Sequence, residues 1–481
     1  MVSRSDNAFS PSRFGGRHPL EQIAGPSLAV TRTQLRIHRC LCALVLTLLF
    51  EGIVRKLAPA ALGIGIFFLK DVIALALLFL CLPARRNAEA TRWLRIMSVV
   101  LGLLSPCILW TAIRDPLLAV FGAKQYALFP IVAVAMCVAY LPNRFREFLT
   151  IFKLMAASLV VTTIVAIAQN RLPAGHWLNM SVGGEDLEGF SAGGYLRVSS
   201  TFPFVGQYCY YLNALCFCLP VLFCLQKARR KWMRTLLLIV LIGLAATGTF
   251  ITGSRGSVIG NLAILSVGGV LAVILGRTKG AGQVIVALVV GAVLLGVLRT
   301  QHPEFFAAYE TRVEGTSESS HLVEITKRVQ SGLLDWTSGW DDAPPSLLGY
   351  GLGVMSNGSE KLSSYAAGWR NSGFWTETDQ GTTFFEGGWY LVAIWYGFRF
   401  WVILETLLMV LKLRSSDARI AAGFAWGFIL VIGVTGTLAI QPPLAIWWWL
   451  AVGLILCLRR LEKERVAEAR NFTLLHNDRY F

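Results

Sequence analysis

Charged side chains are scarce in this sequence. Asp, Glu, Lys and Arg together make up 15% of its 481 residues, whereas a soluble domain carries about a quarter charged residues. The mean hydropathy is high, at +0.59. So little charge cannot cover the surface of a water-soluble protein of this length. The composition therefore predicts an integral membrane protein.

Cysteine is missing from the longest hydrophilic stretch, residues 300–381, although the chain has ten cysteines. This absence excludes a disulfide framework there. Cys216 and Cys218 are two positions apart in an apolar run, so they do not share a face of a helix and do not form a metal pair. The cysteines thus indicate no metal site, and no cofactor is predicted.

Residues 1–36 lack the apolar core and small-residue cleavage site of a secretory signal. They are polar, contain several arginines and are interspersed with Pro and Gly. Such a composition is typical of a disordered tail.

Long apolar runs are what the sequence has in excess. A helix that crosses a bilayer needs about 20 apolar residues. This rule predicts about twelve spans, near residues 37–57, 61–82, 94–113, 117–140, 150–169, 205–226, 235–253, 256–276, 282–299, 383–411, 420–440 and 444–458. No internal repeat relates them, which argues against a repeat-built transporter. The predicted fold class is an all-α polytopic membrane protein.

The formal charge of +16 is concentrated in short clusters between the spans, which argues against nucleic acid as a partner. Every second junction is basic. The basic residues are Arg85, Arg86, Arg92 and Arg95; Arg144 and Arg146; Lys227, Arg229, Arg230, Lys231 and Arg234; Arg277 and Lys279; Lys412 and Arg414; and, in the tail 459–481, Arg459, Arg460, Lys463 and Arg465. By the positive-inside rule these junctions and both termini are cytoplasmic.

Two hydrophilic segments then lie on the opposite, outer side. The shorter one, 170–204, falls within the first nine spans (37–299), and the larger one, 300–381, joins the ninth span to the tenth. Residues 302–335 carry a helix-compatible apolar pattern, so we expect a partly helical, folded outer loop. Spans ten to twelve follow over 382–458.

Some cations lie near the outer side, where the positive-inside rule does not place them. Arg55, Lys70 and Lys124 belong to this group. A charge in the hydrocarbon region costs at least about 2.5–3.5 kcal/mol, so it normally faces a partner or a watery cavity. These residues are candidate substrate-binding groups. The alternative is local ion pairing, in the pairs Lys70–Asp71, Arg114–Asp115 and Lys56–Glu51.

Arg197 and Arg255 have no acid beside them in the sequence. Arg255 follows Ser254 in a turn rich in small residues at the start of a predicted helix. A helix N-terminus with a neighbouring guanidinium suits a phosphate or pyrophosphate. The alternative is a tight turn whose arginine reaches the lipid headgroups.

Several segments together resemble the O-antigen polymerase/ligase superfamily. Segment 197–204 (Arg-Val-Ser-Ser-Thr-Phe-Pro-Phe) is similar to its Arg…Gly-Thr-Phe…Pro-Asn passage, and 252–256 (Thr-Gly-Ser-Arg-Gly) to its Thr-x-Ser-Arg-Gly turn. Segment 344–353 resembles its Gly-x-Gly-x-Gly passage, and 386–390 its Glu-Gly step. Segment 51–56 (Glu-Gly-Ile-Val-Arg-Lys) with Lys70-Asp71 resembles exopolysaccharide polymerases. These segments lie in the family's order within residues 45–440.

The resemblance implies a GT-C-like glycosyltransferase, multi-pass in the bacterial inner membrane, whose donor and acceptor are undecaprenyl-pyrophosphate-linked glycans. No metal is needed, because the pyrophosphate is already an activated leaving group. Arg197 and Arg255 would neutralise its developing charge, with Arg328 assisting from the outer loop. Besides the lipid bilayer, a chain-length regulator and a flippase are the partners to be expected.

A carboxylate or a His must then act as the base that deprotonates the acceptor hydroxyl. Ligases of the family carry a His eleven positions before the Gly that corresponds to Gly387, and this slot holds Thr376. The departure favours a polymerase and makes Glu377 and Asp379 the candidate bases, followed by Glu386. The alternative for these acids is capping of the helix that follows.

Three other functions remain open at this stage. One is an O-antigen ligase that transfers lipid-linked glycan to an acceptor. Another is a transporter or flippase of lipid-linked sugars, although an outer loop of about eighty residues so late in the chain is unusual there. A sensor or structural protein would leave the outer arginines without an evident use.

Overall fold

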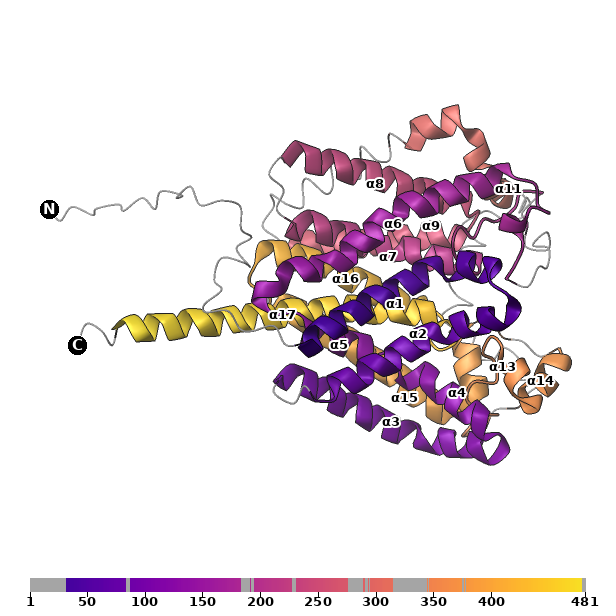
Figure 1. Ribbon diagram of the computed structural model, residues 1–481, viewed down its shortest axis with the longest axis horizontal. Coiled ribbons are helices and arrows are strands. Elements are labelled where there is room, and N and C mark those ends of the chain that lie inside the picture. Colours follow the sequence, from indigo (N-terminus) through magenta and orange to yellow (C-terminus); the bar gives the residue numbers. More distant parts are fainter. Residues whose placement is uncertain are drawn as a thin grey trace.

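The regular elements of the protein are helices throughout the part that the computed structural model describes, namely residues 32–83, 87–182, 191, 194–226, 231–275, 289, 293, 295–314, 344, 346–373, 376 and 378–477. The α-helices, numbered as in Figure 1, are α1 (Arg32–Leu57), α2 (Ala60–Cys81), α3 (Ala88–Arg114), α4 (Pro116–Ala127), α5 (Ile131–Ala139), α6 (Phe145–Arg171), α7 (Val205–Leu225), α8 (Lys231–Ile251), α9 (Arg255–Leu275), α11 (Ala307–Glu314), α13 (Ser359–Leu362), α14 (Ser364–Asn371), α15 (Asp379–Leu411), α16 (Ser416–Thr435) and α17 (Pro442–Asn477).

Ten of these helices are long and apolar enough to cross a membrane. The pair α4 and α5, bent by 50° at a short break, provides an eleventh span if it is counted as one. Pro130 ends this break, where its missing N–H interrupts the helical hydrogen bonds. The structure thus confirms a polytopic helical membrane protein, while the predicted span 282–299 lies mostly outside the described residues.

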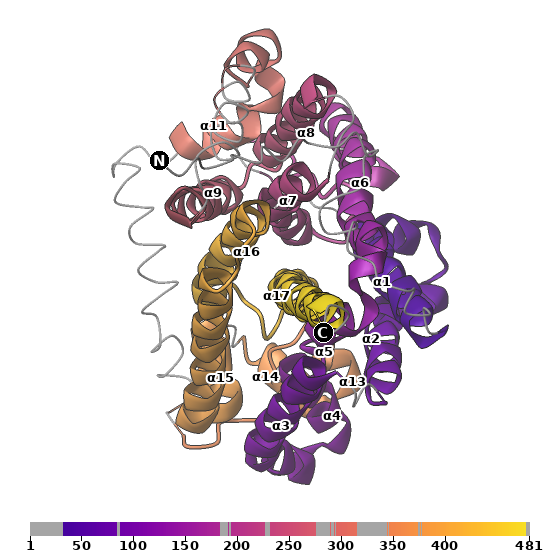
Figure 2. The same ribbon diagram turned by 90° about the vertical axis from the view of Figure 1, so that its left-hand side faces the viewer.

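Helix α17 occupies the centre of the bundle. Seen from one end, the other long helices surround it (Figure 2). Of its membrane-length window, 89% is buried inside the protein, against 22% for α3 and 17% for α9. At the rim, α9 and α16 cross at Gly268 and Gly427, where an added Cβ on Gly427 would lie 2.7 Å from the Gly268 nitrogen. Small residues allow this backbone approach, as is common between membrane helices.

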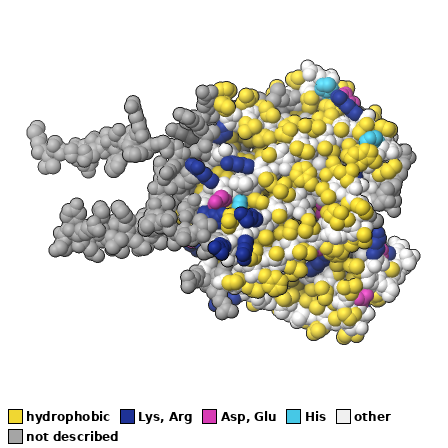
Figure 3. Space-filling view, in the orientation of Figure 1, with side chains coloured by type: hydrophobic (Ala, Val, Ile, Leu, Met, Phe, Trp, Pro, Cys, Tyr) yellow, Lys and Arg dark blue, Asp and Glu magenta, His cyan; other side chains and the backbone are white. Residues whose placement is uncertain are grey.

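The two ends of the bundle differ in character. At one end, here called the tail end, α1 begins and α17 leaves the bundle, because Gln34 and Arg460 both reach carbonyls at the end of α5. Lys and Arg side chains gather at this end of a broad apolar surface (Figure 3). The opposite end, the loop end, carries the connection after α6 together with α11, α13 and α14 (Figure 1).

Helix α15 is not a continuous span as predicted for residues 383–411, because the chain reverses within it. Gly388 has φ +60° and ψ −159°. Asp379 and Arg399 form an ion pair, although residues 20 positions apart in a straight helix lie about 30 Å apart. We call the two parts, 379–387 and 389–411, the short arm and the long arm of a helical hairpin.

Candidate functional site

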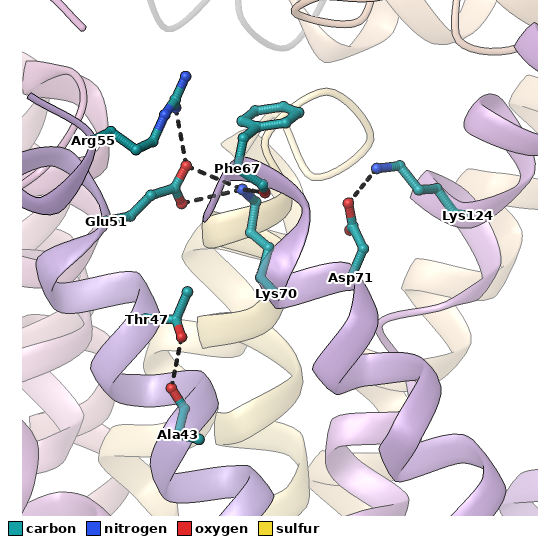
Figure 4. A network of polar contacts seen from close by, with 8 residues as sticks. All are labelled: Ala43, Thr47, Glu51, Arg55, Phe67, Lys70, Asp71 and Lys124. Atoms are coloured by element: carbon teal, nitrogen blue, oxygen red, sulfur yellow. Dashed lines mark hydrogen bonds and ion pairs between the residues drawn. The ribbon is translucent and has the colours of Figure 1, made fainter. Parts of the chain in front are cut away.

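A network of buried charges joins α1 to α2 near the loop end (Figure 4). Glu51, which is 2% exposed, accepts from Lys70 Nζ at 3.1 Å and from Arg55 at 3.1 Å. Lys70 also donates to the Phe67 carbonyl at 2.6 Å and lies 4.2 Å from the centre of the Phe67 ring. One carboxylate therefore holds two cations from different helices.

A second ion pair continues the network to α4. Lys124 Nζ lies 2.5 Å from Asp71 Oδ2, and Figure 4 shows both side chains beside the first group. Asp71 Oδ1 is buried and makes no hydrogen bond in the described structure. Three cations and two acids leave this network with a net charge of 3 − 2 = +1.

The ion pairs predicted between near neighbours in the sequence are wrong. Lys70 pairs with Glu51 rather than with Asp71. Lys56 donates instead to the Leu178 carbonyl, at 2.7 Å. Adjacent residues on a helix point about 100° apart, so Lys70 and Asp71 face different neighbours.

Arg114 and Asp115 also serve separate purposes. The Arg114 guanidinium lies 4.1 Å from the centre of the Trp110 ring. The Asp115 carboxylate accepts from the backbone N–H groups of Leu117 and Leu118 and thereby caps α4.

The two lysines of the network border a small cavity of about 30 Å³. Its lining comprises Phe67, Lys70, Phe121, Lys124, Gln125, Gln207, Asn357 and residues 440–443. The ammonium groups of Lys70 and Lys124 already donate to Glu51, the Phe67 carbonyl and Asp71, so an anion in this cavity would compete with these partners. A cavity of this size holds about one water molecule, so a phosphate group enters only if a bordering loop moves.

The segment 197–204 is threaded between α1 and α6. The Ile53 N–H donates to the Thr201 carbonyl at 2.9 Å, and Ser200 Oγ donates to the Thr162 carbonyl at 2.6 Å. Gly52 makes this possible, since an added Cβ would meet the Phe202 carbonyl carbon at 2.0 Å. The two segments 51–56 and 197–204, far apart in the chain, are thus packed directly together.

The turn that begins α9 lies beside Cys209 in the first turns of α7. The Cys209 thiol on α7 is within reach both of the Arg197 charge and of the hydroxyls of Thr252, Ser254 and Ser257. The turn 252–256, which contains Arg255, and the charge of Arg197 thus both act on the surroundings of Cys209. On α7, Gln207 borders the cavity, and residues two apart point to nearly opposite sides of a helix. The first turn of α7 thus separates the surroundings of Cys209 from the cavity that Lys70 and Lys124 border.

The segment 346–353 fills the break in α15. Beyond Gly388, the N–H groups of Trp389 and Tyr390 donate to the carbonyls of Ser346 and Leu347, at 3.3 and 3.1 Å. Before it, the carbonyls of Phe385 and Glu386 accept from the N–H groups of residues 350 and 351. Backbone groups freed by a helix break need such partners inside a membrane. This segment is therefore a structural part of the hairpin.

The described acids of this region are engaged in structural contacts. Asp379, 2% exposed, accepts from Arg399, from the Tyr396 hydroxyl at 3.0 Å and from the Ala439 N–H at 3.2 Å. The cap of α15 is Thr378 instead, whose hydroxyl accepts from the Gly381 N–H. We therefore do not assign the role of catalytic base to Asp379.

Glu386 is fully buried and lies at the end of the short arm, not at a helix start as the capping alternative required. It accepts from the Tyr126 hydroxyl at 2.8 Å and from the Met355 N–H at 3.0 Å. Thr376 hydrogen-bonds to Thr382 at 2.7 Å. Glu377 and Arg328 lie outside the described residues.

Sequence reasoning did not identify the amides of the cavity or Arg399. Gln125 follows Lys124 within an apolar run, and Arg399 lies inside a predicted span. A polar residue at such a position was the available signal. Gln207, Asn357 and the residues of 440–443 gave none, because they belong to helix ends and loops.

The described residues contain no cluster of three His, Cys, Asp or Glu side chains that could hold a metal ion. Fold and site together define a multi-pass helical membrane protein with buried ion pairs and a cation-lined cavity near its loop end. No protein-family model matches the chain, and a search of curated proteins finds no match to it.

Proposed function

We propose that this protein is a bacterial inner-membrane glycosyltransferase that polymerises undecaprenyl-pyrophosphate-linked oligosaccharide units at the outer face of the membrane. The observation that carries the proposal is that segments resembling the family pack together in pairs. Segment 51–56 packs on 197–204, segment 344–353 packs on 386–390, and the turn 252–256 lies beside Cys209 on α7. Segments 51–56 and 197–204 are far apart in the chain, yet they are in direct contact.

The proposed orientation sets the loop end outside and the basic tail end in the cytoplasm. It is supported by the Lys and Arg side chains at the tail end (Figure 3), following the positive-inside rule. Lipid-linked donor and acceptor would then approach the cation-bearing region from the outer leaflet.

In the proposed reaction, an acceptor hydroxyl attacks the anomeric carbon of the donor. The bond from that carbon to the pyrophosphate oxygen breaks, and the pyrophosphate departs with the electron pair. Arg197 and Arg255 would stabilise its charge. The hydroxyl proton passes to a base, for which Glu377 remains our candidate among the acids of the outer loop.

The test is deletion of the gene, followed by gel analysis of the surface polysaccharide and complementation with variants. We expect single repeat units on the acceptor after deletion. We also expect no rescue by Arg255→Ala and poor rescue by Arg255→Lys, since ammonium lacks the bidentate fork of guanidinium. Arg39→Ala, an exposed cation at the tail end, is the matched control and should restore full-length polymer.

Other products would identify other functions. Accumulation of complete polymer on its lipid carrier would mean a ligase, and cytoplasmic precursor that is never flipped would mean a flippase. Near-normal polymer in cells that express Arg255→Ala at normal abundance would contradict the assigned arginine.

A further inference from the structure

A groove of about 1020 Å³ lies between α3 and the long arm of α15, away from the cavity described above. On α3 its apolar wall is formed by Ile96, Val100 and Leu103, spaced by about one helical turn. On α15 the facing stripe is Ala393, Gly397 and Trp401. The small residues of the second stripe create the space, since an added Cβ on Gly397 would meet no atom within 4 Å.

Both ends of this groove are closed by contacts between the two helices. At the tail end, Arg92 bridges to Glu405 at 2.8 Å. Towards the loop end, the Tyr390 hydroxyl donates to the Leu103 carbonyl at 2.9 Å. From Arg92 to Leu103 the helix rises about 16 Å. This length matches one leaflet of a hydrocarbon core that is about 30 Å thick.

Arg95 lines the same groove, about one turn beyond Arg92 on the same face of α3. Arg92 is held by Glu405 and, at 3.5 Å, by Glu89. Arg95 is exposed and makes no ion pair or hydrogen bond in the described structure. The groove thus combines an apolar channel with an uncompensated guanidinium at headgroup depth.

We propose that this groove binds one anionic phospholipid of the tail-end leaflet, with its phosphate on Arg95 and an acyl chain between α3 and α15. A guanidinium recognises phosphate by paired hydrogen bonds, and basic pockets between membrane helices bind anionic headgroups. A zwitterionic lipid offers a phosphate too, but its ammonium group offsets the attraction.

The test uses the full-length protein in nanodiscs of equal parts phosphatidylglycerol and phosphatidylcholine, followed by native mass spectrometry of the lipid that stays bound. We expect the wild type to retain phosphatidylglycerol preferentially. Arg95→Ala should reduce this preference about fivefold, whereas Arg39→Ala, which removes a tail-end cation outside the groove, should leave it unchanged.

A second pair of variants tests the channel itself. Gly397→Leu should fill the groove and lower the total bound lipid, while Gly102→Leu, also without neighbours within 4 Å, should not. An unchanged lipid preference in Arg95→Ala would overturn the proposal. So would equal losses in Arg95→Ala and Arg39→Ala, or a second copy of the chain bound in place of the lipid.

Discussion

Glu51 shows how a buried charge is accommodated at the level of single residues. Its partners Lys70 and Arg55 lie 19 and 4 positions away in the sequence. From the sequence, the cost of burying each charge indicates that a partner exists. It does not indicate which one, because the helix rotation and the neighbouring helix decide that. The pairing of Asp71 with Lys124, 53 positions away, has the same cause.

We predict that Glu51→Gln lowers the free energy of unfolding by about 3–5 kcal/mol, because it leaves Lys70 buried without its counter-charge. The measurement is the apparent thermal midpoint of the purified protein in detergent. Glu310→Gln, which removes a pair with the exposed Arg299, is the control and should cost at most about 1 kcal/mol. The double variant Glu51→Gln/Lys70→Met should recover part of the loss, and equal midpoints for Glu51→Gln and Glu310→Gln would contradict the prediction.

Asp115, at the loop end, makes a pH-dependent contribution to the stability of the folded protein. A hydrogen bond from Ser363 and those from the N–H groups of Leu118 and Leu117 lower the pKa of this carboxyl below its ordinary value. Stabilisation by Asp115 is therefore fully present above the ordinary pKa and disappears as the pH falls through the lowered one. We expect the wild type to have a higher thermal midpoint than Asp115→Asn at pH 7, with the difference closing in the acid range. A difference that grows on acidification would contradict this sign.

At the scale of elements, the hairpin of α15 marks where sequence reasoning reached its limit. Hydropathy identified the apolar run, because apolarity over about 20 residues is a local property. The run remains apolar through Gly387 and Gly388, which a continuous helix also tolerates. The reversal depends on the segment 346–353, whose backbone satisfies the groups freed at the break, and such a long-range contact leaves no periodic signal. The segment itself was identified only by its glycines and its resemblance to the family.

We predict that Gly388→Ala disrupts the hairpin. The positive φ alone costs about 1–3 kcal/mol for a residue with a side chain, and the added Cβ would lie 2.0 Å from the Ser346 carbonyl oxygen. The readout is the fraction of monodisperse protein in size-exclusion chromatography. Gly397→Ala lies on the same helix in open space and should be neutral or stabilising by up to about 1 kcal/mol. Comparable behaviour of the two variants would show that the break is not needed.

For the whole molecule, the sequence predicted the helical class and the apolar runs that the described helices occupy. In the candidate site, Lys70 and Lys124 border the cavity, and Asp379 and Glu386 make buried structural contacts, while the functional roles of these residues stay predictions. The difference arises because span positions follow from local composition, while the role of an acid follows from the neighbours that folding brings to it.

The overall orientation is tested by labelling single cysteines with an impermeant maleimide in a background free of the ten native cysteines. We expect Ser372→Cys, at the exposed loop end, to react in intact spheroplasts. Lys463→Cys, whose native side chain is 56% exposed, should react only after permeabilisation. The reverse pattern would invert the topology. Labelling of both sites from outside would contradict the placement of the two ends on opposite sides of the membrane.

The central position of α17 has a consequence for biosynthesis. Among the described helices it is the last to leave the ribosome, yet the others surround it (Figure 2). The helices that the translocon inserts earlier therefore form an incomplete bundle. Their inward faces lack the partner that α17 later provides. Completion of the bundle is delayed until synthesis reaches residue 442 and beyond. A chain that stops before α17 would lack the centre of the bundle rather than one peripheral helix. We expect such a chain to be degraded by membrane quality control.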